Sequence, residues 1–153
     1  MATWGEITKD APDFSARVRR RFDMGTNKAL ATIRRDGSPR ISAIEVDFTG
    51  EEVTMGMMGG SLKLLDVRRD PRVALHSPTI DAPEDDPEWP GDAKLAGTLI
   101  ETGAVADPGV PEGSGAFRME ITEAVLTYVG TPADHLVIES WHEGRGWRRD
   151  QRY

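Results

Sequence analysis

The chain has 153 residues, which suits one domain, and its 19 basic and 26 acidic side chains give a formal net charge of −7. This charge disfavours nucleic acid and anionic membranes as partners, because both are bound through Lys and Arg. The absence of cysteine excludes disulfides, thiolate metal ligands and thiol nucleophiles, and it fits a reducing cytoplasm, where we expect the protein.

The first part of the chain is expected to form an N-terminal arm over residues 1–12, followed by a helix. Residues 1–12 carry charges and no apolar run, so they do not resemble a signal peptide, and no apolar stretch suits a membrane span. Phe14, Val18 and Phe22 then recur every four residues and predict a helix over 13–24. Four arginines on this helix form either a solvated face or a contact to an anionic cofactor or partner subunit. They are Arg17, Arg19, Arg20 and Arg21.

Alternating apolar and polar residues next predict three strands. Residues 28–35 and 40–48 are joined through Asp36-Gly37, a strong hairpin signal because glycine accepts positive φ freely. A third strand is expected over 52–58, after a second turn. The sequence therefore favours a three-stranded meander.

A short helix is expected after this meander. Gly59-Gly60 leads into it, Ser61 is a suitable N-cap, and Asp70-Pro71 ends it, which gives a helix over 62–69. Residues 72–77 then return to strand.

Residues 78–91 form a loop rich in acidic side chains and proline. A loop of this length is either a functional lid or a solvated acidic connector. Trp89 lies within it, and this side chain either covers the substrate side of a site or packs in the core.

Three further strands, over 92–105, 116–129 and 135–141, precede a basic tail over 144–153. The first is expected to bend at Gly97 or Gly103, and a slip in the alternation near 122–124 indicates a β-bulge. Six or seven strands and two helices predict a single α+β domain, mainly β, built as an antiparallel barrel or curled sheet.

Anion binding finds more support in the residues than side-chain catalysis or metal binding. The histidines are scattered and no metal-ligand spacing is present, so neither a side-chain catalytic triad nor a metal is expected. At 59–63 a glycine pair enters a helix N-terminus, where backbone N–H groups, the Ser61 hydroxyl and the Lys63 ammonium could bind an anion. The alternative is a simple turn, a cap and a solvated lysine.

Two motifs in residues 28–77 carry a family resemblance. The first contains Leu30-Ala31-Thr32, Asp36-Gly37, Pro39 and Ser42, and the second contains Ser61, Lys63, Arg69-Asp70-Pro71-Arg72-Val73 and Leu75. Together they resemble the pyridoxamine 5′-phosphate oxidase-like split-barrel family, which includes proteins that use FMN or the deazaflavin coenzyme F-420. The resemblance implies a six-stranded antiparallel split β-barrel with short flanking helices.

The resemblance also implies a homodimer with one flavin-type cofactor per subunit in the groove between subunits. It places the cofactor phosphate at Lys63, with Ser61 beside it, and the ring along 39–45 and 54–58. The candidates for ring contacts are Ser42, Ala43, Met55, Gly56, Met57 and Met58. A methionine-rich wall suits a planar ring, although core packing explains these methionines equally well. Arg145 and Arg148 would reach the cofactor of the partner subunit.

This resemblance implies an oxidoreductase that passes hydride between the cofactor ring and a small organic substrate. The alternatives are a non-catalytic dimer that binds or sequesters a flavin or haem, and a structural dimer with a degenerate site. The basic C-terminal motif of true pyridoxamine phosphate oxidases has no clear copy here, so vitamin B6 oxidation is not expected. Glu45, if it faced the ring, would disfavour an anionic reduced cofactor. The residues do not decide between FMN and coenzyme F-420.

Overall fold

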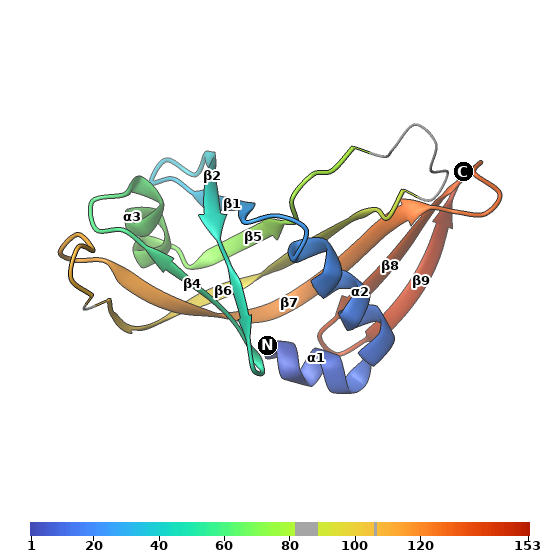
Figure 1. Cartoon of the computed structure of the whole chain (residues 1–153), viewed down its shortest axis with the longest axis horizontal. Helices are drawn as coiled ribbons and strands as arrows, with labels where there is room; N and C mark the ends of the chain where they lie inside the picture. Colours follow the sequence, from blue (N-terminus) through green and yellow to red (C-terminus); the bar gives the residue numbers. More distant parts are fainter. Residues whose placement is uncertain (82–88, 106) are drawn as a thin grey trace.

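The computed structural model describes residues 1–81, 89–105 and 107–153, which form one curled antiparallel sheet with helices packed against it (Figure 1). The helices in this part of the chain are α1 (Trp4–Asp10), α2 (Pro12–Phe22) and α3 (Leu62–Arg69). The strands are β1 (Asn27–Ile33), β2 (Pro39–Glu45), β3 (Asp47–Thr49), β4 (Glu52–Met57), β5 (Arg72–His76), β6 (Asp92–Ala104), β7 (Gly115–Val129), β8 (Leu136–His142) and β9 (Gly146–Arg152).

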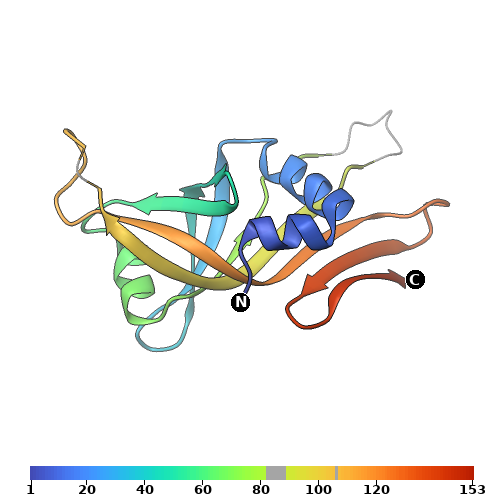
Figure 2. The same ribbon diagram turned by 90° about the horizontal axis from the view of Figure 1, so that it is seen from below.

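The sheet begins and ends with strands that are neighbours in the sequence. Its hydrogen-bonded order is β2-β1-β5-β6-β7-β4-β3, with β8 added to β7 and β9 to β8. Only Val46 separates β2 from β3, so the sheet curls until its ends meet, yet no pairing among the described strands joins them. Figure 2 shows this curl beside the long β6–β7 ribbon. The open antiparallel barrel confirms the predicted fold class.

The expected meander is wrong, because β4 does not extend the β1–β2 hairpin. It pairs with β7, from Thr54↔Arg118 to Met57↔Gly115, and with the short strand β3. Alternation along the chain predicted the strand itself. Its partner is set by which apolar faces pack together, and that information lies far away in the sequence.

The segment expected as an N-terminal arm contains a helix, α1, which the sequence analysis did not predict. Thr3 and Glu6 form a reciprocal capping box, in which each backbone N–H donates to the other residue's side chain. Trp4 is buried and packs edge-on against Phe48, with ring centroids 5.1 Å apart. The Thr-x-x-Glu spacing is the sequence signal for this helix.

The helix predicted over 13–24 is present as α2, which begins at Pro12 and ends at Phe22. Phe14, Val18 and Phe22 are all buried, as their spacing predicts. Phe22 also packs against Phe48 of β3, so the same ring anchors both N-terminal helices to the sheet.

The long strands β6 and β7 are irregular where the sequence predicts it. Their register shifts between Ala96 and Gly97, and again between Glu101 and Gly103. A Cβ atom on Gly97 would lie 2.0 Å from the carbonyl oxygen of Glu120, so only glycine permits this approach. The first shift passes over Thr122 on β7, within the predicted bulge.

The basic tail contains a further strand, which raises the strands of the described chain to nine and its helices to three. β9 pairs with β8 along its whole length. Its side chains are mostly exposed and charged, so the alternation that marks half-buried strands is missing from its sequence.

Candidate functional site

The split between β2 and β4 has a free backbone edge on each side. Within the described chain β2 ends the hydrogen-bonded path and pairs with β1 alone. β4 pairs with β7 along Thr54–Met57, but its other edge pairs with β3 only along Glu52–Thr54. The backbone of 55–57 therefore keeps one open edge, and Cα atoms of β2 and β4 come within 8 Å of each other. Open edges of this kind offer N–H and C=O groups to a ligand.

The start of α3 lies against the edge of β2. Gly60 enters the helix with φ of +86°, a conformation that favours glycine. Lys63 Nζ donates a hydrogen bond to Ala43 O at 3.0 Å. An ammonium has three N–H donors, so two remain for a ligand.

The first turn of α3 fits an anionic group. Ser61 occupies the N-cap position, but its hydroxyl makes no capping bond, and Oγ is buried without a hydrogen-bond partner in the described structure. A buried hydroxyl normally has a partner. An anion at this position would also receive the free N–H groups of the first turn and the positive end of the helix dipole. The structure places Ser61 at the N-cap and Lys63 in the first turn of the same helix. Their role as a phosphate site stays a prediction.

Asp66 fastens α3 to the β1–β2 hairpin, a contact that the sequence analysis missed. This buried carboxylate accepts hydrogen bonds from Thr32 Oγ1 at 2.8 Å, Arg40 Nε at 2.7 Å and Arg69 Nη2 at 3.3 Å. Burial alone would raise the pKa of Asp66, but the bonds from Arg40, Thr32 and Arg69 outweigh it and lower the pKa. The only sequence signal was a single acidic residue within the helix.

The methionines of β4 do not form a wall on one side of the split. Met55 and Met57 are 5% and 2% exposed and pack in the core, whereas Gly56 and Met58 are exposed. Core packing therefore explains the side chains of Met55 and Met57. Ligand binding by the backbone of this stretch remains a prediction.

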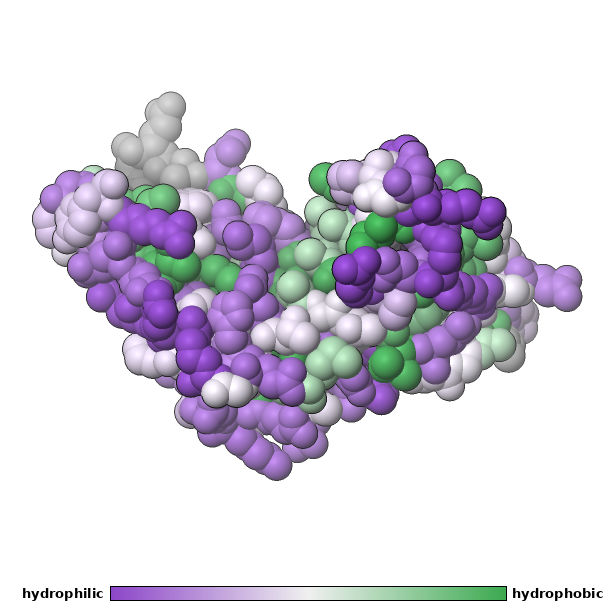
Figure 3. All heavy atoms as spheres, turned by 180° about the vertical axis from the view of Figure 1, so that it is seen from behind, coloured by the Kyte–Doolittle hydropathy of each residue, from purple (hydrophilic) through white to green (hydrophobic). Residues whose placement is uncertain are grey.

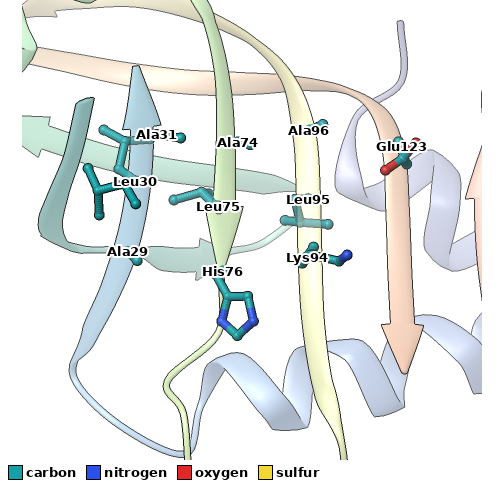
Figure 4. Close-up of a pocket in the computed structure, with 11 residues that line it drawn as sticks. Ala29, Leu30, Ala31, Ala74, Leu75, His76, Lys94, Leu95, Ala96 and Glu123 are labelled. Atoms are coloured by element: carbon teal, nitrogen blue, oxygen red, sulfur yellow. The ribbon is translucent and has the colours of Figure 1, made fainter. Parts of the chain in front are cut away.

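The outer face of the sheet carries small apolar side chains. Cross-strand pairing aligns Ile41, Ala31, Ala74 and Ala96 in one row. A depression of about 190 Å³ lies over this row, with His76, Lys94 and Glu123 among its lining residues (Figure 4). Exposed sheet faces are usually polar, so this surface suits a flat ligand or a covering partner.

The predicted contacts Ser42 and Ala43 lie beside this face. Both line a second depression of about 370 Å³, together with Ala29, Ile41 and His76. Figure 3 shows the molecule hollowed between two lobes, with pale and green residues in the hollow. Glu45 is exposed and pairs with Asn27 at the end of the β1–β2 ladder.

Arg145 and Arg148 are not brought to Lys63 of their own chain. They lie on the β8–β9 hairpin, whereas α3 lies at the other end of the molecule (Figure 1). Arg145 Nη2 donates to Ser140 Oγ at 2.7 Å, and Arg148 Nε donates to Asp150 Oδ2 at 2.7 Å. A contact to a partner's cofactor stays a prediction.

Trp89 is half-buried between α2 and the end of β7. Residues 82–88, which make up the centre of the predicted acidic loop, lie outside the described residues. The two roles predicted for this loop, a functional lid and a solvated acidic connector, therefore stay predictions.

A buried carboxylate network was also missed by the sequence analysis. Glu139 on β8 is 2% exposed and accepts two hydrogen bonds from Arg17, at 2.5 and 2.7 Å. Tyr128 Oη and Trp147 Nε1 donate to the same carboxylate at 2.6 and 3.0 Å. Burial would raise the pKa of Glu139, but these three partners lower it below its ordinary value. Arg17 is thus neither a free surface charge nor available to a cofactor.

Within residues 1–81, 89–105 and 107–153, no three or more His, Asp or Glu side chains gather as metal ligands. None of the helices described there combines the length and the apolar character that crossing a membrane requires.

Comparison with known proteins supports the fold through structure and not through sequence. No profile of a known family and no curated protein matches the sequence. Among solved structures, a pyridoxamine 5′-phosphate oxidase-related, FMN-binding protein from Nostoc punctiforme is similar over 94% of this chain and 96% of its own. The identity is 10% and the TM-score 0.62. The chain has the split-barrel fold.

Two further solved structures share this fold. An F-420 reductase is 18% identical, with 69% of this chain and 94% of that chain covered and a TM-score of 0.52. A haem-binding protein from Mycobacterium smegmatis is 14% identical, with 90% and 87% covered and a TM-score of 0.54. One fold therefore serves ligands of different chemistry, and the choice among them depends on the residues of the site.

Proposed function

We propose that this protein is a homodimeric oxidoreductase that binds FMN or coenzyme F-420 and passes hydride between the cofactor ring and a small organic substrate. The observation that carries the proposal is the first turn of α3, where Lys63 bonds to the edge of β2 and the Ser61 hydroxyl has no partner among the described residues. FMN and coenzyme F-420 both combine a phosphate with a planar ring. The FMN-binding protein and the F-420 reductase share the fold.

The residues have separate roles in this proposal. Lys63 and Ser61 would hold the phosphate, assisted by the N-terminus of α3. The open backbone edges of β2 and 55–57 would hydrogen-bond the polar edge of the ring. The cofactor, when bound, supplies the hydride chemistry, and the protein supplies position and electrostatics. This division explains why a side-chain nucleophile is not needed.

The dimer is part of the proposal because the outer face of the sheet exposes a row of apolar side chains. Ile41 is 78% exposed at one end of its row of alanines. Covering this face with a second copy would remove apolar surface from water, at about 25 cal/mol per Å². The cofactor groove would then lie between subunits, within reach of residues such as Arg145 from the partner.

Haem binding is the second candidate. His76 lies at the margin of the flat apolar face, and its Nδ1 is 2.6 Å from Ser77 O, which leaves Nε2 on the other side of the ring. Its Nε2 is 3.7 Å from the Asp92 carboxylate. A planar macrocycle suits this surface, and the Mycobacterium smegmatis protein that shares the fold binds haem.

The test is a fluorescence titration of the protein, freed of bound ligand, with FMN and separately with coenzyme F-420. We expect Lys63→Ala to weaken binding at least about tenfold, since hydrogen bonds to charged groups contribute about 1.5–3 kcal/mol. Lys9→Ala removes an exposed lysine of α1 and is the matched control. Binding of haem alone would replace the proposal with the second candidate.

Turnover is tested separately from binding. Protein that binds the reduced cofactor is mixed with candidate acceptors, and cofactor oxidation is followed by absorbance. A rate above that of free reduced cofactor supports an enzyme. Tight binding of the cofactor without faster cofactor oxidation for any acceptor would indicate a protein that carries the cofactor and does not catalyse a reaction.

A further inference from the structure

We infer that the cleft between α2 and the C-terminal end of β7 binds a small planar molecule bearing a carboxylate or phosphate group, with Arg20 and Arg21 as its charge partners. The cleft has a volume of about 420 Å³. Its lining combines basic and aromatic side chains with apolar and backbone groups, and includes Arg17, Arg20, Arg21, Trp89, Tyr128 and Thr131. This inference does not depend on the proposed cofactor.

The charge of this cleft is not balanced within the described chain. Arg17 is neutralised by Glu139 and Asp13, whereas Arg20 and Arg21 make no ion pair with any described residue. Arg21 Nε is buried and has no hydrogen-bond partner in that structure. Burial, and then the charge of Arg20, lower the pKa of Arg21. A buried guanidinium donor without an acceptor is costly, and an anion in the cleft would supply the acceptor.

The aromatic side chains indicate the rest of the ligand. Trp89 and Tyr128 both line the cleft, and Tyr128 is held in place through its hydroxyl, which donates to Glu139. Flat aromatic walls favour a planar group, and two guanidinium groups beside them favour a carboxylate or phosphate on that group. A surface that bound only inorganic anions would not need aromatic walls.

The cleft is separate from the start of α3 in the same chain. Arg68 of α3 donates to Gly113 O, two residues before β7 begins at Gly115, whereas the cleft begins near Leu126 and ends beyond Val129. At about 3.3 Å per residue, the stretch of β7 from Gly115 to Leu126 is roughly 36 Å long. Figure 1 shows α3 and α2 over different parts of the ribbon.

The test uses three probes at constant ionic strength: benzoate, inorganic phosphate and benzyl alcohol. Binding is measured by isothermal titration calorimetry and by the NMR shift of the Arg21 Nε–H signal. We expect benzoate to bind best, phosphate more weakly and benzyl alcohol least. Arg20→Gln and Arg21→Gln should each weaken benzoate at least about tenfold. Arg35→Gln, an exposed arginine of the β1–β2 turn, removes the same charge and should change nothing.

Three results would overturn the inference. Absence of saturable binding by both anions would remove the site. An equal loss of benzoate affinity in Arg35→Gln would show that benzoate is attracted by the overall charge of the protein and not by this cleft. Equal binding of benzoate and benzyl alcohol would show that the site does not recognise an anionic group. Equal binding of benzoate and phosphate would show that it does not recognise a planar group. Arg20 is exposed, so its variant folds even if Arg21→Gln does not.

The stability of the free protein gives an independent readout. If Arg21 is held unpaired for a ligand, Arg21→Gln should keep or raise the melting temperature without anion and lose the increase that benzoate gives the wild type. A purely structural arginine would give the opposite result, with a lower melting temperature in both conditions.

Discussion

At the scale of single residues, the interior of this protein depends on two buried carboxylates, each held by several donors. Glu139 connects α2, β7, β8 and β9 through Arg17, Tyr128 and Trp147. Asp66 connects α3 to the β1–β2 hairpin. In both cases the charge is stabilised by positioned donors and not by water, so removal of the charge leaves the donors unsatisfied.

Glu139→Gln should therefore destabilise the fold by about 3 kcal/mol, because Arg17 loses its buried partner while the side chain keeps its size. The measurement is the free energy of unfolding from urea titration. Asp150→Asn is the control, because it removes a partly exposed carboxylate that pairs with Arg148 of the same strand, β9, and its effect should be much smaller. Equal effects of the two variants would contradict the importance given to the network.

At the scale of elements, sequence patterns predicted individual strands and helices better than their partners. The four-residue spacing of Phe14, Val18 and Phe22 predicted α2, and the Gly59-Gly60 pair before Ser61 predicted the start of α3. The pairing of β4 with β7, and the addition of β9 to β8, depend on contacts between distant parts of the chain. The same limit applies to the site. Ser61 and Lys63 could be predicted because one helix start holds both, but Asp66 needs the position of Thr32 and Arg40, which only the folded chain supplies.

The bulge in the β6–β7 ribbon gives a prediction about an element. Gly97→Ala would place a Cβ atom 2.0 Å from Glu120 O, so the ribbon must shift, and we expect a loss of about 1–3 kcal/mol in unfolding free energy. Gly56→Ala on β4 is the matched control, because its nearest neighbour would be 3.9 Å away. Chemical denaturation of both variants is the measurement. A neutral Gly97→Ala would show that the bulge relaxes without cost.

At the scale of the whole molecule, acid should weaken the fold through the two buried carboxylates. Folding lowers the pKa of Glu139 and of Asp66, so the unfolded chain binds more protons at acidic pH. The stability that they contribute is present above the ordinary carboxyl pKa of about 4 and is lost as the pH falls through the lower folded values. Urea midpoints between about pH 7 and pH 3 should fall in the wild type and fall less in Asp66→Asn. Identical pH profiles would assign acid sensitivity to other groups.

The outer face of the sheet connects the fold to the proposed assembly. An apolar row of small side chains lets a second copy approach closely, and a charge placed in that row would have to be buried unpaired. We therefore expect light scattering with size exclusion to find a dimer for the wild type and a monomer for Ile41→Lys. Because Ile41 is exposed within one chain, the variant should fold and keep its far-ultraviolet circular dichroism. Leu136→Lys changes an exposed apolar residue of β8 outside this face, and it should leave the dimer intact. A monomeric wild type, or a dimeric Ile41→Lys, would place the subunit contact elsewhere and separate the cofactor proposal from this surface.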